Sequence, residues 1–175
     1  YPGNFNTEFG NVTGGVVDLK VRDLAEDQFQ GDLDINIFDL GFSLEGPITK
    51  KLSAGLSAHR SWIDFILSPF KDTLSDSGVQ IQKLPSYYDY QFLLNYKASN
   101  KHKIKNIIYG SSDRFEAFME DLKDSKDNRI LGQLLLSSSF HKGQSKIQSN
   151  FNKDFDQEVS LYVGTMKTIF SVGKL

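Results

Sequence analysis

Most of the chain alternates apolar and polar residues with a period of two, which predicts β-strands that each present one apolar face. The alternation of residues 32–37 changes phase before residues 40–45, so we expect either a bulge or a tight hairpin at Phe38-Asp39. The other predicted strands are 52–67, 86–99, 104–115, 130–141 and 145–163. The chain is therefore expected to be all-β, with about seven strands.

One segment has helical spacing. Phe115, Phe118, Met119 and Leu122 recur at intervals that place them on one side of a helix, so residues 113–124 are the best helical candidate. Elsewhere the sequence gives almost no helical signal.

The connections between the predicted strands alternate in length. Short polar turns are expected at 49–51, 100–103 and 142–144, and long polar loops at 68–85 and 121–129. Short turns at one end and long loops at the other are typical of an up-and-down antiparallel barrel.

The two faces of the predicted strands differ in polarity. One face is apolar and aromatic, as at Tyr88, Tyr90 and Phe92, while the other carries Asp, Asn, Gln, Ser and Lys. A soluble barrel of this size needs an apolar interior, whereas the polar face here suits a water-filled one. We therefore expect part of a transmembrane β-barrel wall; a soluble β-sandwich or a lipocalin-like barrel is the alternative.

The composition is compatible with this interpretation. The 175 residues carry a formal charge of −2 and a mean hydropathy of −0.36, and none of them is cysteine. Disulfides and thiolate sites are thereby excluded, and the charge gives no bias toward nucleic acid. No apolar run is long enough for a transmembrane helix, and no secretory signal is visible near Tyr1. Alternating strands dilute the hydropathy signal, so a membrane barrel stays possible.

No group of residues suggests catalysis, a cofactor or a resident metal. His59, His102 and His141 lie far apart in the sequence, without the close spacing of a zinc site. Neither a cysteine nucleophile nor a Gly-x-Ser-x-Gly elbow is present. We therefore expect a protein that is not an enzyme.

Two acidic sets resemble cation sites only in part. Asp32, Asp34 and Asn36 begin like a calcium loop, but the glycine and the bidentate glutamate of such a loop are missing. We interpret them as polar residues that face a lumen. The second set would suit a cation, although a solvated loop is the simpler interpretation; its members are Asp121, Asp124 and Asp127.

Several aromatic residues lie near the predicted strand ends, where a membrane barrel carries its aromatic girdle. They are Trp62, Tyr87, Tyr88 and Tyr90. Half-buried aromatic residues of an ordinary sheet are the alternative. Arg60 falls on the apolar phase of its strand, where it would snorkel to an interface, pair with an acid, or mark a register shift that turns it inward.

The beginning of the chain carries several separated motifs in a fixed order. They are Tyr1-Pro2-Gly3, Phe9-Gly10, Gly14-Gly15-Val16-Val17-Asp18 and Arg22. This series resembles the last stretch of the plug domain in TonB-dependent outer-membrane receptors, where the chain leaves the plug and enters the barrel. A weaker similarity extends through Glu45-Gly46-Pro47 and the strand that carries Arg60, and it favours a tight extracellular hairpin at Phe38-Asp39.

The resemblance implies two parts, the end of a plug domain at 1–25 and the first barrel strands at 26–175. It places Gly10, Gly14, Gly15 and Arg22 at the plug–barrel junction. Paired glycines allow positive φ and close backbone approach, which suits such a passage; an ordinary Gly-Gly hairpin turn is the alternative.

The function implied by the resemblance is energy-coupled uptake of a scarce nutrient across a Gram-negative outer membrane. Ferric siderophores, cobalamin and glycans are the substrate classes of the family. The implied partners are outer-membrane lipid, the small-molecule or chelate substrate, and the TonB energy-transducing complex, which would act through the missing plug N-terminus. The long loops at 68–85 and 121–129 would contact substrate, and no individual ligand residue can be transferred.

The chain is much shorter than the family's receptors. Seven strands fall short of the roughly eight that the smallest closed barrels use, no TonB-contacting box is visible, and the last residues, SVGKL, do not end in an aromatic residue. We therefore expect a fragment of a receptor. A soluble all-β binding or adhesion module and a small passive porin-like barrel are the competing functional hypotheses.

Overall fold

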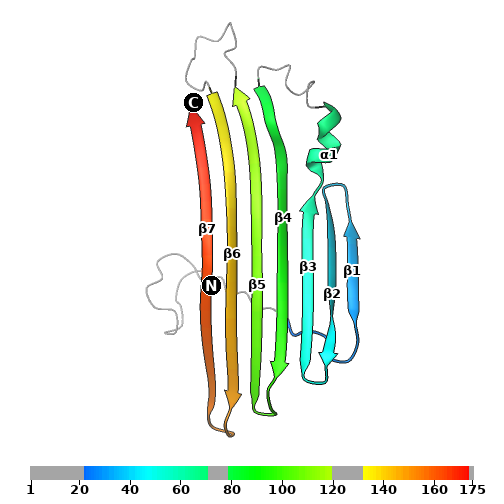
Figure 1. Cartoon of the computed structure of the whole chain (residues 1–175), viewed down its shortest axis with the longest axis vertical. Coiled ribbons are helices and arrows are strands. Elements are labelled where there is room, and N and C mark those ends of the chain that lie inside the picture. The colour runs from blue at the N-terminus through cyan, green and yellow to red at the C-terminus, as the bar shows by residue number, and fades with distance from the viewer. Residues whose placement is uncertain (1–21, 71–78, 120–131, 174–175) are drawn as a thin grey trace.

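The computed structural model describes residues 22–70, 79–119 and 132–173. They form a single antiparallel sheet of seven strands, with one short α-helix and one 3-10 helix (Figure 1). The elements are β1 (Gln30–Ile35), β2 (Asp39–Thr49), β3 (Leu52–Ser61), α1 (Ile63–Leu67), η1 (Ser68–Phe70), β4 (Val79–Lys97), β5 (His102–Met119), β6 (Gly132–Asn150) and β7 (Asp156–Gly173).

Each strand pairs with its neighbours in the chain, in the order β1-β2-β3-β4-β5-β6-β7. The expected all-β, up-and-down antiparallel arrangement with seven strands is thus confirmed. The sheet is open, because β1 pairs only with β2 and β7 only with β6 among the described residues. β4 to β7 are much longer than β1 to β3 (Figure 1).

The short turns gather at one end of the sheet, drawn at the bottom of Figure 1. They join β2 to β3 at 50–51, β4 to β5 at 98–101 and β6 to β7 at 151–155. The β1–β2 hairpin and α1 lie at the opposite end (Figure 1). The predicted turns at 49–51 and 100–103 and the hairpin at Phe38-Asp39 are therefore confirmed to within a residue or two.

The predicted turn at 142–144 is wrong, because these residues lie inside β6. Gly143 pairs with Ile108 of β5 and Val163 of β7, so both ladders continue through it. The real turn follows Asn150, and the Phe151 amide donates to the Phe155 carbonyl at 3.1 Å. Lys-Gly-Gln satisfies local turn chemistry, but partners on both sides keep it extended.

The predicted helix at 113–124 is also wrong over its described part, since residues 113–119 extend β5. Phe115 pairs with Leu136 of β6, and Arg114 pairs with both Ser86 and Ser137. Hydrogen bonds from two neighbouring strands outweigh a weak helical pattern, which would satisfy only its own backbone. Residues 120–124 lie outside the described part of the chain.

Two other boundaries differ from the prediction. Residues 79–85 were expected in a long loop but belong to β4, whose register shifts between Lys83 and Ser86. This irregularity accommodates Pro85, which has no amide to donate to a ladder. The strand expected over 52–67 ends at Ser61, and α1 follows it.

The register separates the sheet into a largely apolar face and a face that is polar over β2 to β4 but also carries Phe115, Phe140 and Phe170 on β5 to β7. On the apolar face, Leu44, Leu56 and Phe92 lie on adjacent strands, whereas their sequence neighbours Ser43, Ser57 and Gln91 line up on the polar face. The apolar face is uncovered, with Leu44 53% and Phe92 40% exposed. Of the hydrophobic side chains that the structure describes, only three are buried: Leu24, Leu84 and Ala117.

The apolar area crosses the strands obliquely. Two rows of paired residues show this. In the row nearer the short turns, every residue from β2 to β7 is apolar or glycine: Leu44, Leu56, Phe92, Ile108, Gly143 and Val163. Two residues farther along, the row is apolar, aromatic or glycine on β1 to β5 and polar on β6 and β7: Leu33, Phe42, Ala58, Tyr90, Gly110, His141 and Thr165. The strands therefore run at an angle to the apolar band.

Candidate junction between the N-terminal segment and the polar face

Residues 22–29 precede β1, and residues 22–26 contact the polar face of the sheet. Leu24 is the anchor of this segment, with only 5% of its surface exposed. It packs over Gly55 of β3, where a Cβ atom would lie 2.6 Å from the Leu24 Cδ2 atom. The absence of a side chain at Gly55 thus makes the space that Leu24 occupies.

Arg22 forms the first of three ion pairs between this segment and the sheet. Its guanidinium donates to Glu45 of β2 with an Nη1–Oε1 distance of 2.6 Å. Glu45 is 8% exposed, and the Ala25 amide donates to the same carboxylate oxygen at 3.4 Å. A carboxylate buried to this degree needs charged or hydrogen-bonding partners.

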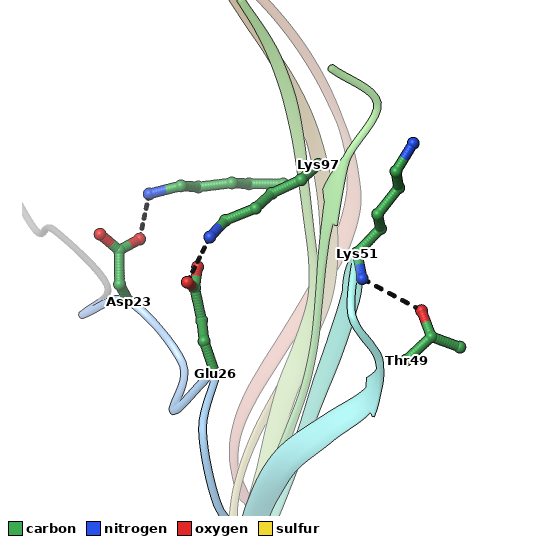
Figure 2. Close-up of polar contacts among 6 residues, drawn as sticks. Asp23, Glu26, Thr49, Lys51 and Lys97 are labelled. Atoms are coloured by element: carbon green, nitrogen blue, oxygen red, sulfur yellow. Dashed lines mark hydrogen bonds and ion pairs between the residues drawn. The ribbon is translucent and has the colours of Figure 1, made fainter. Parts of the chain in front are cut away.

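Two lysines of the polar face form ion pairs with acidic residues that follow Arg22. Lys105 of β5 donates to Asp23, and Lys97 of β4 donates to Glu26. Figure 2 shows the Asp23 and Glu26 carboxylates each in contact with an ammonium group. Within five residues, the segment is therefore tied to β2, β4 and β5.

The contacts of Asp23 with the sheet lower the pKa of its carboxyl group. The hydrogen bond from Lys105 lowers the pKa of Asp23 below its ordinary 3.8, and the charges of Lys105, Lys103 and Lys97 act in the same direction. Partial desolvation opposes the change. Because the carboxyl is more acidic when docked, the pair favours docking above the ordinary pKa and loses this effect as Asp23 protonates.

We expect the stabilising effect of Asp23 to disappear on acidification. The difference in free energy of unfolding between the native chain and Asp23→Asn should be constant above about pH 5 and should shrink below about pH 4. Urea unfolding of both proteins from pH 7 to pH 3 measures it. A difference that stays constant over the whole range would contradict the contribution of the ionised Asp23.

An open hollow of about 540 Å³ adjoins the docked segment on the polar face. Its polar lining comes from the N-terminal segment and from β2 to β6: Arg22, Ser43, Glu45, Ser57, Gln91, Tyr109 and Gln144. Gln144 also donates to the Tyr162 hydroxyl at 2.8 Å. Charged, amide and phenol groups of this kind suit hydrogen bonding to a polar solute and to water.

Of the four predicted junction residues, Arg22 is described and contacts the sheet. Gly10, Gly14 and Gly15 lie outside the described residues. Lys97 and Lys105 could not be selected from the sequence, because both occupy ordinary polar positions of alternating strands. Glu45 lay inside the Glu-Gly-Pro motif, and that motif was the one available signal for it.

Asp32 and Asn36, from the set that begins like a calcium loop, form hydrogen bonds within the β1–β2 hairpin. The Asn36 side chain accepts from the Phe38 and Asp39 amides at 2.8 and 3.0 Å and donates to the Asp39 carboxylate at 2.6 Å. Asp32 accepts from Ser43 across the strand pair at 3.4 Å. No cluster that could bind a metal occurs in the described part of the chain, and the second acidic set, at 121–127, lies outside it.

The three histidines stay apart and each contacts a different group. His59 pairs with Asp89 at 3.0 Å, and His102 contacts the Ser149 hydroxyl at 2.9 Å. His141 lies 2.9 Å from the Tyr90 hydroxyl on the apolar face, with stacked rings whose centroids are 5.9 Å apart. Gly110 lies between them and leaves room for both rings, since a Cβ there would meet each within 3 Å.

Arg60 pairs with an acid, one of the three possibilities considered for it. Its guanidinium donates to Asp64 of α1 at 3.2 Å. The proposed register shift is wrong, because Arg60 pairs with Leu40 and Tyr88 in an unbroken ladder and stays on the apolar face. Trp62 lines the same hollow as Arg60 at the α1 end, whereas Tyr87 lies on the polar face and donates to Asp39.

No family model matches the chain, nor does any curated protein or solved structure. Among the described residues, neither helical segment has the length and apolar character required to cross a membrane.

Proposed function

We propose that this sheet is part of the wall of an outer-membrane β-barrel and that residues 22–29 join it to a plug inside the barrel. The chain would then belong to a TonB-dependent receptor, which takes up a scarce nutrient such as a ferric siderophore, cobalamin or a glycan. The observation that carries the proposal is the position of the N-terminal segment. It is tied by Arg22, Asp23 and Glu26 to the polar face, while the apolar face stays open.

The division of the two faces supports a wall between lipid and water. A soluble sheet buries its apolar face against another layer, and no second layer covers Leu44, Phe92 or Leu161 in the described structure, where Leu161 is 71% exposed. In a membrane barrel, hydrocarbon covers the outward side chains and the lumen hydrates the inward ones. The soluble binding module, which needed the aromatic face to pack inward, is therefore less well supported.

The oblique apolar band supports the same conclusion. Barrel strands tilt by roughly 35–45° to the barrel axis, so a band of constant height must cross them at an angle. The apolar area reaches Leu33 and Phe42 on β1 and β2 but stops below His141 and Thr165 on β6 and β7. The apolar area thus lies at a different position along β1 and β2 than along β6 and β7, as expected for strands that are tilted in a barrel wall.

The edge of β7 supports a wall that continues. This strand has 18 residues, and nearly all of its side chains are exposed. A long edge with unpaired backbone groups readily pairs with another strand. In the proposed barrel, the next wall strand pairs with β7, and closure removes the edge.

The proposal assigns directions to the two ends of the sheet. The short turns would face the periplasm, and the β1–β2 hairpin and α1 would face the outside. Substrate would be contacted from the outer connections and from the plug, and the TonB complex would act on the plug. No residue among those described is assigned to substrate.

Cysteine labelling tests the wall directly, because the chain has no natural cysteine. Phe92→Cys and Gln91→Cys are neighbours on opposite faces of β4. In lipid vesicles, we expect a membrane-impermeant maleimide to modify Gln91→Cys at least tenfold faster than Phe92→Cys, because hydrocarbon excludes the reagent. Equal rates, or faster labelling of Phe92→Cys, would overturn the proposal.

A further inference from the structure

A second open hollow, of about 580 Å³, lies on the apolar face where β3 passes into α1. Five of its six lining residues are Leu40, Ser61, Trp62, Phe65 and Ile66. Phe65 is 77% exposed and Ile66 45%. Its volume falls in the range of roughly 300–1,000 Å³ that is typical of sites for small molecules.

The sixth lining residue is Arg60, a cation at the edge of an otherwise apolar surface. In its row of the sheet, Arg60 lies between Leu40 and Tyr88. Its side chain is 56% exposed, and the contact with Asp64 engages one Nη atom at 3.2 Å. Since a guanidinium has several N–H donors in a fixed plane, others remain for an anion.

The indole of Trp62 is held in place beside this cation. Its Nε1 donates to the Ile37 carbonyl at 2.9 Å, and the Trp62 amide donates to the Phe38 carbonyl at 3.0 Å. The ring therefore forms a positioned apolar wall with its polar atom already satisfied. An apolar chain can pack against it without leaving the indole N–H unpaired.

We propose that this hollow binds an anionic, phosphate-bearing lipid of the surrounding membrane. An acyl chain packs against Leu40, Trp62 and Phe65, and the phosphate accepts hydrogen bonds from Arg60. A phosphodiester matches a guanidinium in geometry and carries the opposite charge. The hollow is also continuous with the apolar band through Leu40. This site rests on the proposed membrane wall, because only then does lipid meet this face.

The Asp64 carboxylate competes with the phosphate for Arg60. It holds the guanidinium at the rim of the hollow, and its own negative charge weakens the attraction for an anion. The two residues therefore predict opposite effects on the lipid preference. Neutralising Arg60 removes the preference, whereas neutralising Asp64 increases it.

Quenching of Trp62 fluorescence measures lipid binding at this site, because Trp62 is the only tryptophan of the chain. The full chain is folded into phosphatidylcholine vesicles that contain a small fraction of acyl-brominated lipid, either phosphatidylglycerol or phosphatidylcholine. Bromine quenches an indole only on close approach, so the ratio of the two quenching curves gives the relative affinity. We expect phosphatidylglycerol to bind about two- to fivefold more tightly, the range of a solvent-exposed ion pair.

Three variants separate the site from general membrane contact. In Arg60→Gln the preference should fall to about one, in Asp64→Asn it should exceed that of the native chain, and in Lys167→Gln, on the same row four strands away, it should be unchanged. Inorganic phosphate at equal concentration should not relieve the quenching, since the acyl chain holds the lipid.

The outcomes distinguish the two proposals. Equal quenching by both brominated lipids in the native chain overturns the anionic site and leaves the membrane wall in place. A preference that Arg60→Gln retains also overturns the site. Absence of quenching by either lipid overturns the membrane wall itself.

Discussion

Replacing Phe92 by arginine should destabilise the membrane-folded chain by about 2–4 kcal/mol. This is the cost of a cation on the lipid side of a membrane barrel near the bilayer midplane. Phe92 lies centrally on the apolar face, between Leu56 and Ile108 on the neighbouring strands. Urea unfolding from lipid vesicles gives the difference in free energy.

Gln91→Arg is the matched control for Phe92→Arg. It places the same cation one residue away, on the polar face beside the hollow that contains Glu45. We expect a change within about 0.5 kcal/mol, as for an exposed substitution. Equal costs at the two positions would show that the faces do not separate lipid from water.

Replacing Gly55 by leucine should release the docked N-terminal segment. The new Cβ would lie 2.6 Å from Leu24 Cδ2, so Leu24 must leave its buried position. Exposing a buried leucine costs roughly 1.5–3 kcal/mol, and the ion pairs of Arg22, Asp23 and Glu26 lose their geometry with it. We expect trypsin to cleave after Arg22 at least tenfold faster, because cleavage requires an undocked backbone.

Gly143→Leu controls for the effect of leucine at a strand glycine. The nearest side-chain atom to a Cβ at this position is Val163 Cγ1, at an ordinary contact distance of 3.6 Å. Cleavage after Arg22 should keep its native rate in this variant. Rapid cleavage in Gly143→Leu, or none in Gly55→Leu, would contradict a specific role of the Leu24 contact.

In the proposed receptor, these contacts would transmit a pulling force from the plug to the wall. A pull on an upstream plug would reach the wall through residues 22–26. Three ion pairs to three strands spread that load over β2, β4 and β5. The segment would act as a fixed attachment of the plug to the wall.

The class of fold and the existence of an apolar face follow from the local pattern of residues alone. Alternation is a local property, and each strand carries it independently, so Leu44, Phe92 and Val163 could be assigned to the apolar face before any strand was paired. Turn polarity located two of the three short turns. The motifs around Arg22 also predicted a plug–barrel junction, which stays a prediction.

The ends of the strands and the contacts between polar residues depend instead on how the strands pair. Lys142-Gly143-Gln144 satisfies turn chemistry and residues 113–119 have helical spacing, yet both are extended because strands on either side supply hydrogen bonds. The contacts of Glu26 with Lys97 and of Asp23 with Lys105 join residues more than seventy positions apart. Such pairs depend on the register of several strands, and no local pattern encodes it.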